Sequence, residues 1–243
     1  MQKSVYLRHI KNQKTHWWFH GRRNLIFSLI KRFVYKKKKL RILDFGCGSG
    51  TNIKALLNFG EVHAYEKDKN TNQYLLSKYK NIKKVKILKK IKQNYLYDCI
   101  VLADVLEHIK DDKKILITLR KKLKKEGIIL LTVPAYNFLF SKKDEVLKHF
   151  RRYEYSIFKK LLMKDFKVLK ISFFNTILFL PIAIITVFFK FLKFDYINEV
   201  EETPNVFINK ILYLILRLET LLLKYIDFPF GMSIILVGEK KNL

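Results

Sequence analysis

Short apolar runs alternate with amphipathic segments between residues 41 and 133. This alternation of strand and helix patterns predicts a doubly wound parallel β-sheet with helices on both faces. The expected strands comprise residues 41–45, 61–66, 85–88, 98–103 and 127–133. The expected helices between them comprise residues 49–58, 71–79 and 111–124. The predicted fold class is therefore α/β.

The pattern changes after residue 133. A polar and aromatic segment over residues 134–155 precedes a short expected helix at 156–164 and an expected strand at 167–174. The last apolar run, residues 232–240, predicts a closing strand. A long stretch of chain thus separates the last two strands of the sheet.

Two apolar segments lie between these last two strands. Residues 171–189 carry no formal charge, and this length approaches the roughly 20 residues that cross a bilayer. The run begins within the expected strand, however, and Pro181 interrupts the rest. A second helix is expected from Pro204 to about Ile226, with a narrow polar face. The two segments predict a pair of helices inserted between the strands.

This insertion has three interpretations: part of the core, a dimer interface, or an anchor lying in the plane of a membrane. We favour the anchor. A helix that spans the bilayer is disfavoured, because spanning would separate the closing strand from its sheet. The chain is then one domain with four parts: an N-terminal helical lid (1–39), a core sheet (40–175), an apolar helical insertion (176–229) and a closing strand (230–243).

Composition narrows the class of protein. The 243 residues are 49% hydrophobic, which is enough to bury a full core and excludes a disordered chain. The net charge of +28 suggests nucleic acid or an anionic membrane, but the lysines are scattered and select neither partner. The only cysteines, Cys47 and Cys99, lie in apolar strand contexts, and the N-terminus lacks a secretory signal pattern. We therefore expect a cytoplasmic protein without disulfides.

A glycine turn follows the first expected strand, in the segment RILDFGCGSG. Gly46, Gly48 and Gly50 follow neither common phosphate-binding pattern, and no lysine follows to reach a phosphate. Asp44 stands two residues before the first glycine, where a carboxylate would repel a pyrophosphate. The turn therefore favours a cationic ligand that carries an amine.

The segments that follow form an ordered set with this turn. Glu66 ends the second strand about twenty residues later, where doubly wound sheets place an acid that binds a ribose diol. The stretch YDCIVLADVLEHI and its continuation complete the set. From Leu40 to Tyr136 the chain resembles the class I S-adenosylmethionine-dependent methyltransferases. This resemblance implies a Rossmann-like, seven-stranded methyltransferase sheet, with a dehydrogenase-type fold that binds NAD as the rival.

The resemblance also implies roles for individual residues. The glycine turn would approach the amino-acid end of S-adenosylmethionine, the acid on the second strand would hold the ribose hydroxyls, and the end of the fourth strand would line the methionine portion. The implied cofactor-binding residues are Asp44, Gly46, Cys47, Gly48, Glu66, Ala103, Asp104 and Val105. Many family members have an acid after the third strand that contacts adenine; here backbone groups or Gln93 take that place.

Two further segments resemble a bacterial subgroup associated with surface-polysaccharide and lipid-carrier pathways. They are HWWFHGRR at residues 16–23 and FSKKDEVLKHFRRY at residues 140–153. In the first, the aromatic residues form either a lid over the cofactor pocket or a helix packed on the sheet edge. In the second, Arg151 and Arg152 either bind a phosphate or form a solvated basic face. The subgroup implies a glycan or lipid-linked acceptor.

Glu107, His108 and His149 are the candidate catalytic residues. The segment DVLEHI places the first two where the fourth strand passes into its helix, beside the expected methyl group. His149 is suited to remove a proton from a hydroxyl acceptor at neutral pH. The set also resembles the metal-binding residues of some ubiquinone-pathway and small-RNA 2′-O-methyltransferases, and a helix-capping role is a third alternative. We expect a metal-free base and no metal site.

The sequence thus predicts an enzyme that methylates a hydroxyl of a glycan, lipid-linked or other small-molecule acceptor. It is expected in the cytoplasm, peripherally bound to the inner face of the membrane. One alternative is an RNA 2′-O-methyltransferase, which the charge favours and the apolar insertion disfavours. Another is a non-catalytic cofactor-binding scaffold, which Gly46, Gly48 and Glu66 disfavour. The sequence sets neither the acceptor atom nor the oligomeric state.

Overall fold

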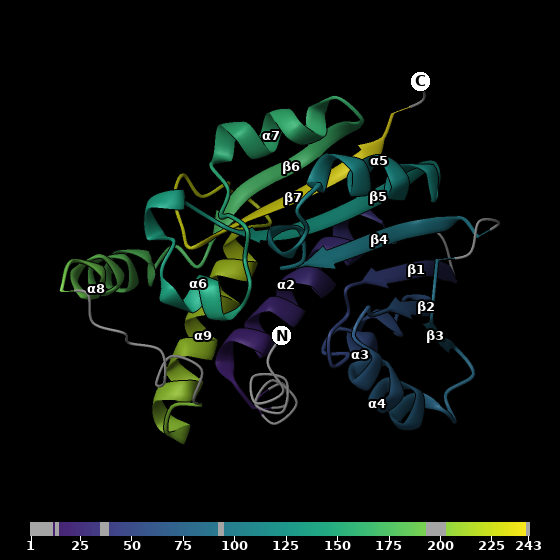
Figure 1. Ribbon diagram of the computed structural model, residues 1–243, viewed down its shortest axis with the longest axis horizontal. Coiled ribbons are helices and arrows are strands. Elements are labelled where there is room, and N and C mark those ends of the chain that lie inside the picture. The colour runs from purple at the N-terminus through teal and green to yellow at the C-terminus, as the bar shows by residue number, and fades with distance from the viewer. Residues whose placement is uncertain (1–11, 13–14, 35–38, 92–94, 193–202, 242–243) are drawn as a thin grey trace.

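Seven strands form one mixed sheet in the described part of the chain, in the order β3-β2-β1-β4-β5-β7-β6 (Figure 1). The computed structural model describes residues 12, 15–34, 39–91, 95–192 and 203–241. The strands are β1 (Leu40–Phe45), β2 (Gly60–Tyr65), β3 (Val85–Leu88), β4 (Tyr97–Ala103), β5 (Leu123–Pro134), β6 (Phe166–Phe174) and β7 (Ser233–Lys240). The predicted α/β fold with a seven-stranded sheet is confirmed.

One strand runs against the others. Neighbouring strands among β1 to β5 are parallel, whereas β7 is antiparallel to both β5 and β6. β7 begins beside the C-terminal end of β6, because Phe174 at the end of β6 pairs with Ser233 at the start of β7. The predicted parallel arrangement concerned residues 41–133 and is confirmed for β1 to β5, and the expected closing strand is present as β7, which runs antiparallel.

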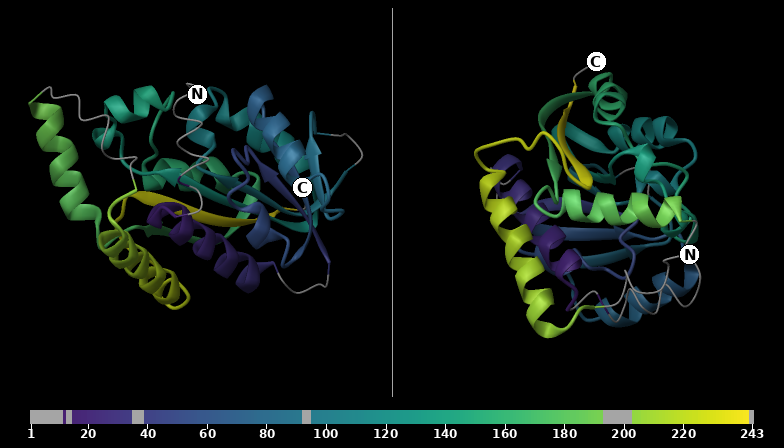
Figure 2. Two further views of the ribbon diagram at one scale, coloured as in Figure 1. Left: turned by 90° about the horizontal axis from the view of Figure 1, so that it is seen from below. Right: turned by 90° about the vertical axis from the view of Figure 1, so that its left-hand side faces the viewer.

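Helices cover both faces of the sheet (Figure 2). The helices are α2 (Trp17–Phe33), α3 (Ile53–Leu56), α4 (Lys69–Tyr79), α5 (Asp112–Lys121), α6 (Lys142–Val146), α7 (Tyr155–Met163), α8 (Phe179–Phe191) and α9 (Val206–Leu222), with single turns η1 (Leu106–His108) and η2 (Asn137–Leu139). Side chains of α2, α3, α4 and α9 join one buried apolar cluster, and those of α5 and α7 join a second. The strands between the clusters read as apolar runs because both of their faces are buried.

Three predicted elements have wrong boundaries, one of them the helix expected at residues 111–124, which ends at Lys121. The helix expected at residues 49–58 is reduced to α3, because a turn with positive φ at Gly50 occupies the chain up to its first residue. The fifth strand was expected at residues 127–133, but β5 begins at Leu123, since α5 ends at Lys121. None of these differences changes the C-terminal ends of β1, β2 and β4, where the predicted cofactor-binding residues lie.

The insertion between β6 and β7 packs partly as core. A Cβ atom on Gly21 of α2 would lie 2.8 Å from Cβ of Leu216, so only glycine lets α9 approach α2 this closely. Glu219 of α9 is fully buried and accepts hydrogen bonds from the backbone N–H groups of Thr176 (3.0 Å) and Ile177 (2.8 Å). One side of α9 therefore belongs to the body of the protein.

The remaining surface of the insertion is apolar and exposed. On α8 it includes Leu180, Ile184, Phe188 and Phe191, and on α9 it includes Val206, Phe207, Leu214 and Leu218. Phe191 is 83% exposed and Val206 is 86% exposed. Within the described ranges, no helix has both the length and the apolarity needed to cross a bilayer. Both helices lie toward the same end of the sheet, where α9 runs beside α2 and α8 projects outward (Figures 1 and 2).

Candidate active site

The glycine turn after β1 leaves open space at one position. Gly46, Gly48 and Gly50 have positive φ, a conformation that L side chains rarely adopt. A Cβ atom on Gly46 would lie 2.8 Å from two carbons of Val105, whereas one on Gly48 would meet no atom within 4 Å. The backbone at Gly48 thus borders a space that a ligand can enter closely.

Glu66, directly after β2, is attached to this turn. Its Oε2 accepts a hydrogen bond from the Gly48 N–H at 2.9 Å, and its Oε1 accepts one from the Asp68 N–H at 3.0 Å. An ionised carboxylate has about four lone-pair sites, so two such bonds leave acceptor capacity for a pair of hydroxyls. The structure brings Glu66 and the glycine turn together as the prediction requires.

Asp44 lies deep beside the turn. It is 1% exposed, and its Oδ2 has no hydrogen-bond partner among the described residues. Burial raises the pKa of Asp44 to about 7, although the guanidinium of Arg22 acts in the opposite direction. A buried carboxylate without a full set of partners is destabilised, and a cationic ligand group would relieve this.

The end of β4 provides a second acidic group. Asp104 has φ of 56°, and its Oδ1 accepts a hydrogen bond from the Thr132 hydroxyl at 2.7 Å. Its Oδ2 forms an ion pair with Arg22 of α2. The flanking Ala103 and Val105 are buried against the two apolar clusters. This end of β4 therefore lies beside the glycine turn, with which Val105 is in contact.

Arg22 is a site residue that the sequence analysis missed. It belongs to the segment HWWFHGRR. Its place among the apolar positions of the helix was the one feature of the sequence that could have indicated a buried, functional arginine. Trp17 and Trp18 of the same segment pack against a buried cluster, which favours the packed-helix alternative over a free lid. Cys47 is also buried, and burial raises the pKa of its thiol, so it lines the turn as a neutral group. Gln93, the candidate adenine contact, lies outside the described residues.

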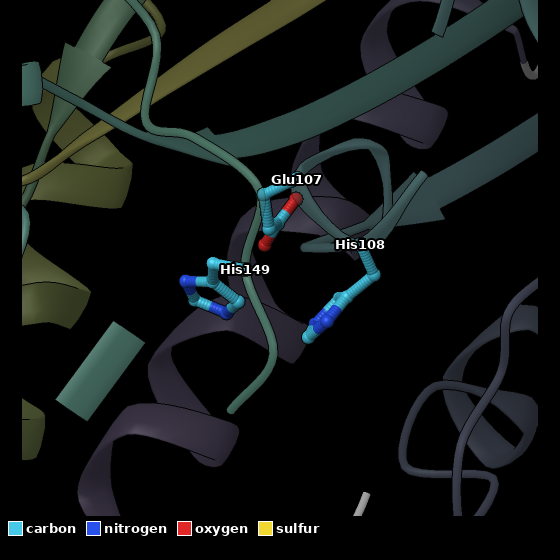
Figure 3. A group of neighbouring side chains, drawn as sticks. All are labelled: Glu107, His108 and His149. Atoms are coloured by element: carbon cyan, nitrogen blue, oxygen red, sulfur yellow. The ribbon is translucent and has the colours of Figure 1, made fainter. Parts of the chain in front are cut away.

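Glu107, His108 and His149 form one cluster (Figure 3). One ligand atom from each of these residues lies within 4.8 Å of the others. The rings of His108 and His149 are 4.6 Å apart between centroids. Glu107 is fully buried, and neither of its carboxylate oxygens has a hydrogen-bond partner from another described residue. The structure thus brings together residues that are far apart in the sequence.

The charge states in this cluster are shifted. Burial, with a contribution from Asp104, raises the pKa of Glu107 well above its usual value. Burial and the neighbouring His149 lower the pKa of His108 to about 4, so this imidazole is neutral at pH 7. The Nδ1 atom of His149 lies 2.8 Å from Oδ1 of Asp144. Burial opposes ionisation of Asp144, but hydrogen bonds from His149 and Arg152 hold its pKa below the usual range.

The two arginines of the segment HFRRY are engaged within the protein. Arg152 donates from Nε and Nη2 to Asp144 at 3.0 and 2.9 Å. Arg151 donates to Asp112 at 2.8 Å and to the carbonyl of Lys110 at 2.7 Å. These contacts favour a role in fixing the segment that carries His149 over the predicted phosphate contact.

Comparison with known proteins identifies the family and the fold. A model of the family described as "Methyltransferase domain" matches residues 18–169. Comparison with the curated proteins gives no match. Among solved structures, the N-methyltransferase NodS from Bradyrhizobium japonicum, in complex with S-adenosyl-L-homocysteine, has a TM-score of 0.55 at 9% identity and covers 89% of this chain and 86% of that one.

Two further solved structures are similar. The plantazolicin methyltransferase BpumL, also in complex with S-adenosylhomocysteine, has a TM-score of 0.60 at 17% identity, with 99% of this chain and 90% of that chain covered. A SAM-dependent methyltransferase from Archaeoglobus fulgidus has a TM-score of 0.56 at 16% identity, with coverage of 90% and 94%. At these identities the likeness concerns the fold. Since the family model spans more than half of the sequence, the chain belongs to the methyltransferase domain family and is an S-adenosylmethionine-dependent methyltransferase.

Proposed function

We propose that the protein transfers the methyl group of S-adenosylmethionine to a hydroxyl of a glycan or lipid-linked acceptor at a membrane surface. The observation that carries the proposal is the position of α8, whose exposed face is apolar and which contacts residues 136–138, shortly before the segment that bears His149. The Tyr136 ring lies 5.3 Å from that of Phe179 at the start of α8, and Lys190 of α8 donates to the carbonyl of Phe138 at 3.2 Å. The likeness of HWWFHGRR and HFRRY to the bacterial subgroup supports the same acceptor class.

The geometry of the site supports the cofactor-binding roles that the resemblance implies. The backbone of Gly46, Cys47 and Gly48 approaches the amino-acid end of the cofactor, and Glu66 receives the ribose hydroxyls. Asp44 faces the cationic ammonium group, which satisfies its buried carboxylate. The methionine portion lies along the end of β4, at Ala103, Asp104 and Val105.

Methyl transfer requires alignment and removal of one proton. A lone pair on the acceptor oxygen forms the new bond to the methyl carbon as the carbon–sulfur bond breaks, which releases S-adenosylhomocysteine. The acceptor proton moves to the cluster formed by Glu107, His108 and His149. Asp144 fixes the ring of His149 through Nδ1, so the lone pair of Nε2 remains available to accept that proton.

Replacement of Glu66 with alanine is expected to weaken S-adenosylhomocysteine binding by about 1–3 kcal/mol, because the ribose hydroxyls lose a charged acceptor. Isothermal titration calorimetry measures this directly. Glu145→Ala is a matched control, since Glu145 is exposed on α6 and pairs with Lys142. Unchanged affinity in Glu66→Ala would remove Glu66 from the cofactor site.

The protein is expected to sediment with vesicles without detergent and to need residues 176–226 for this. Phosphatidylglycerol should strengthen binding through Lys190, Lys210, Lys224 and also Lys193, which lies outside the described residues. High salt should weaken only that electrostatic part, because the apolar contact is not screened.

Two matched variants test the placement of the membrane surface. The double variant Phe191→Glu with Phe207→Glu places charge on the exposed insertion and should abolish vesicle binding. Ile157→Glu on α7, where Ile157 is 60% exposed, should bind as the wild type does. A monomeric wild-type protein that stays in solution beside vesicles at low salt would contradict the proposed membrane contact.

The acceptor is tested by mass spectrometry of glycolipids from cells with and without the enzyme. A mass increase of one methyl group on a hydroxyl, dependent on the enzyme, is the expected result. Methylation of RNA riboses instead, with glycolipids unchanged, would favour the alternative acceptor.

A further inference from the structure

A buried carboxylate and two imidazoles converge beside the end of β4, and the part of the chain that the structure describes offers the carboxylate no partner from another residue. We propose that Glu107, His108 and His149 bind a divalent transition-metal cation, for which zinc is the best fit. Figure 3 shows the carboxylate of Glu107 together with the two rings, which extend from η1 and from the segment after α6.

Glu107 provides the first reason. Its side chain is fully buried, and both oxygens lack a hydrogen bond from another described residue. Buried carboxylates are normally paired, hydrogen-bonded or coordinated to a metal, because an isolated one is costly. The nearest acidic neighbour, Asp104, is already occupied by Arg22 and Thr132. A cation between Glu107 and the rings would supply the missing partner.

The ring orientations provide the second reason. His149 contacts the buried Asp144 through Nδ1 at 2.8 Å, which places the proton on Nδ1 and leaves the lone pair of Nε2 for a ligand. Asp144 is itself held by the fork of Arg152. The ring of His108 forms a hydrogen bond with the backbone of Lys148. Such outer contacts are the usual support of metal-binding histidines.

The backbone holds the two halves of the cluster together. The Phe150 N–H donates to the carbonyl of Glu107 at 2.7 Å, which joins the segment HFRRY to η1. The His149 N–H donates to the carbonyl of Asp144 at 2.8 Å, and the His108 N–H donates to that of Val105 at 3.1 Å. The ligand positions are therefore fixed by hydrogen bonds that do not depend on a bound ion.

The donor set selects the metal. Two imidazoles and one carboxylate suit zinc, which binds three such ligands at about 2.0–2.2 Å in catalytic sites and keeps a fourth position open. Magnesium and calcium prefer oxygen ligands throughout. In a tetrahedral site, two atoms bound at these lengths lie about 3.3–3.6 Å apart. The separations of up to 4.8 Å here must therefore close by about 1 Å or slightly more when a cation binds, a movement that the exposed His108 side chain can make.

This inference deepens the proposed function, and only its catalytic consequence rests on that function. With a cation bound, Nε2 of His149 would serve as its ligand in place of the proton-accepting role proposed above for the metal-free protein, and the acceptor hydroxyl would take the open fourth position. The cation then lowers the pKa of the hydroxyl, and its proton leaves to solvent before the oxygen attacks the methyl carbon.

The test is metal binding by the full chain, measured without any acceptor. Protein stripped with a chelator is titrated with Zn²⁺ against a chromophoric competitor and, separately, with Co²⁺, whose visible absorption reports tetrahedral coordination. The expected result is one equivalent bound, with at least about a 10–100-fold loss of affinity in His108→Ala, His149→Ala and the outer variant Asp144→Asn. His20→Ala on α2 is the matched control and should bind as the wild type does.

His108→Ala keeps the test decisive, because His108 is exposed and its removal leaves no buried group unpaired. Absence of stoichiometric binding, or equal affinity in wild type, His108→Ala and His149→Ala, would overturn the metal site. Methyl transfer is measured separately with and without chelator. Full turnover by metal-free protein would overturn the catalytic consequence alone, whereas zinc binding without any methylated glycolipid would support the site and contradict the proposed acceptor.

Discussion

Replacing His149 with alanine is expected to lower the turnover number by about 10²–10⁴-fold, because the acceptor hydroxyl loses either the base that removes its proton or a ligand of the cation that would lower its pKa. The affinity for S-adenosylhomocysteine should not change, since the contacts of His149 with Asp144, His108 and Glu107 involve residues outside the proposed cofactor-binding set. Initial rates with a saturating acceptor, together with calorimetry of the same variant, separate the two quantities.

His20→Ala is the control for this variant, because it removes an imidazole from α2 at a position outside the cluster. If His149→Ala, assayed with a chelator present, turned over as fast as the wild type, His149 could be neither the base nor a metal ligand in the reaction. Glu107 and His108 would then have only a structural, helix-capping role after β4. A parallel loss of rate and of cofactor affinity would instead indicate a wider disturbance of the site.

Asp144→Ala is expected to reduce the free energy of unfolding by about 3–5 kcal/mol, since removing one partner of a buried ion pair leaves the other uncompensated. Asp144 is 1% exposed and accepts hydrogen bonds from Arg152 and from the backbone and hydroxyl of Ser141. The Arg152 side chain, 10% exposed, would remain buried without its carboxylate. Urea denaturation followed by circular dichroism measures the change.

The neighbouring Glu145→Ala serves as the reference for that measurement. Its side chain is 56% exposed and pairs with Lys142 across one turn of α6, so its loss should change stability by about 0.5 kcal/mol or less. A change below about 1 kcal/mol in Asp144→Ala would show that solvent reaches Arg152 readily. The segment HFRRY would then be less rigid than its hydrogen bonds indicate.

The strands were predictable because their environment leaves a direct signal in the sequence. β1 and β4 are buried on both faces, so they appear as apolar runs with little interruption. The direction of β7 has no such signal, because an apolar strand reads the same in either orientation. The length of the helix after the glycine turn was overestimated. The hydrophobic pattern included residues of the turn itself, where the positive φ of the glycines is not helical.

The site was predictable where its residues are close in sequence. The glycine turn and Glu66 belong to adjacent strands, so topology alone places them together. Arg22 is 82 positions from Asp104 along the chain, and no local pattern identifies a pair so far apart. His149 was named as a candidate, but only the hydrogen bond between Phe150 and Glu107 places its segment on η1. The part played by Asp144 required the folded arrangement.

With the cofactor ammonium placed beside Asp44 as proposed, the buried position of this carboxyl couples cofactor binding to proton release. With a pKa of about 7 in the free protein and 3.8 as its reference, Asp44 holds its proton more tightly in the folded chain than in the unfolded one. Its contribution to stability is therefore present at acidic pH and is lost as the pH rises toward 7. A cofactor ammonium reverses this preference, because it stabilises the carboxylate and expels the proton. Cofactor binding should then tighten as the pH rises toward 7 and level off above it, which makes the enzyme responsive to acidification of its surroundings.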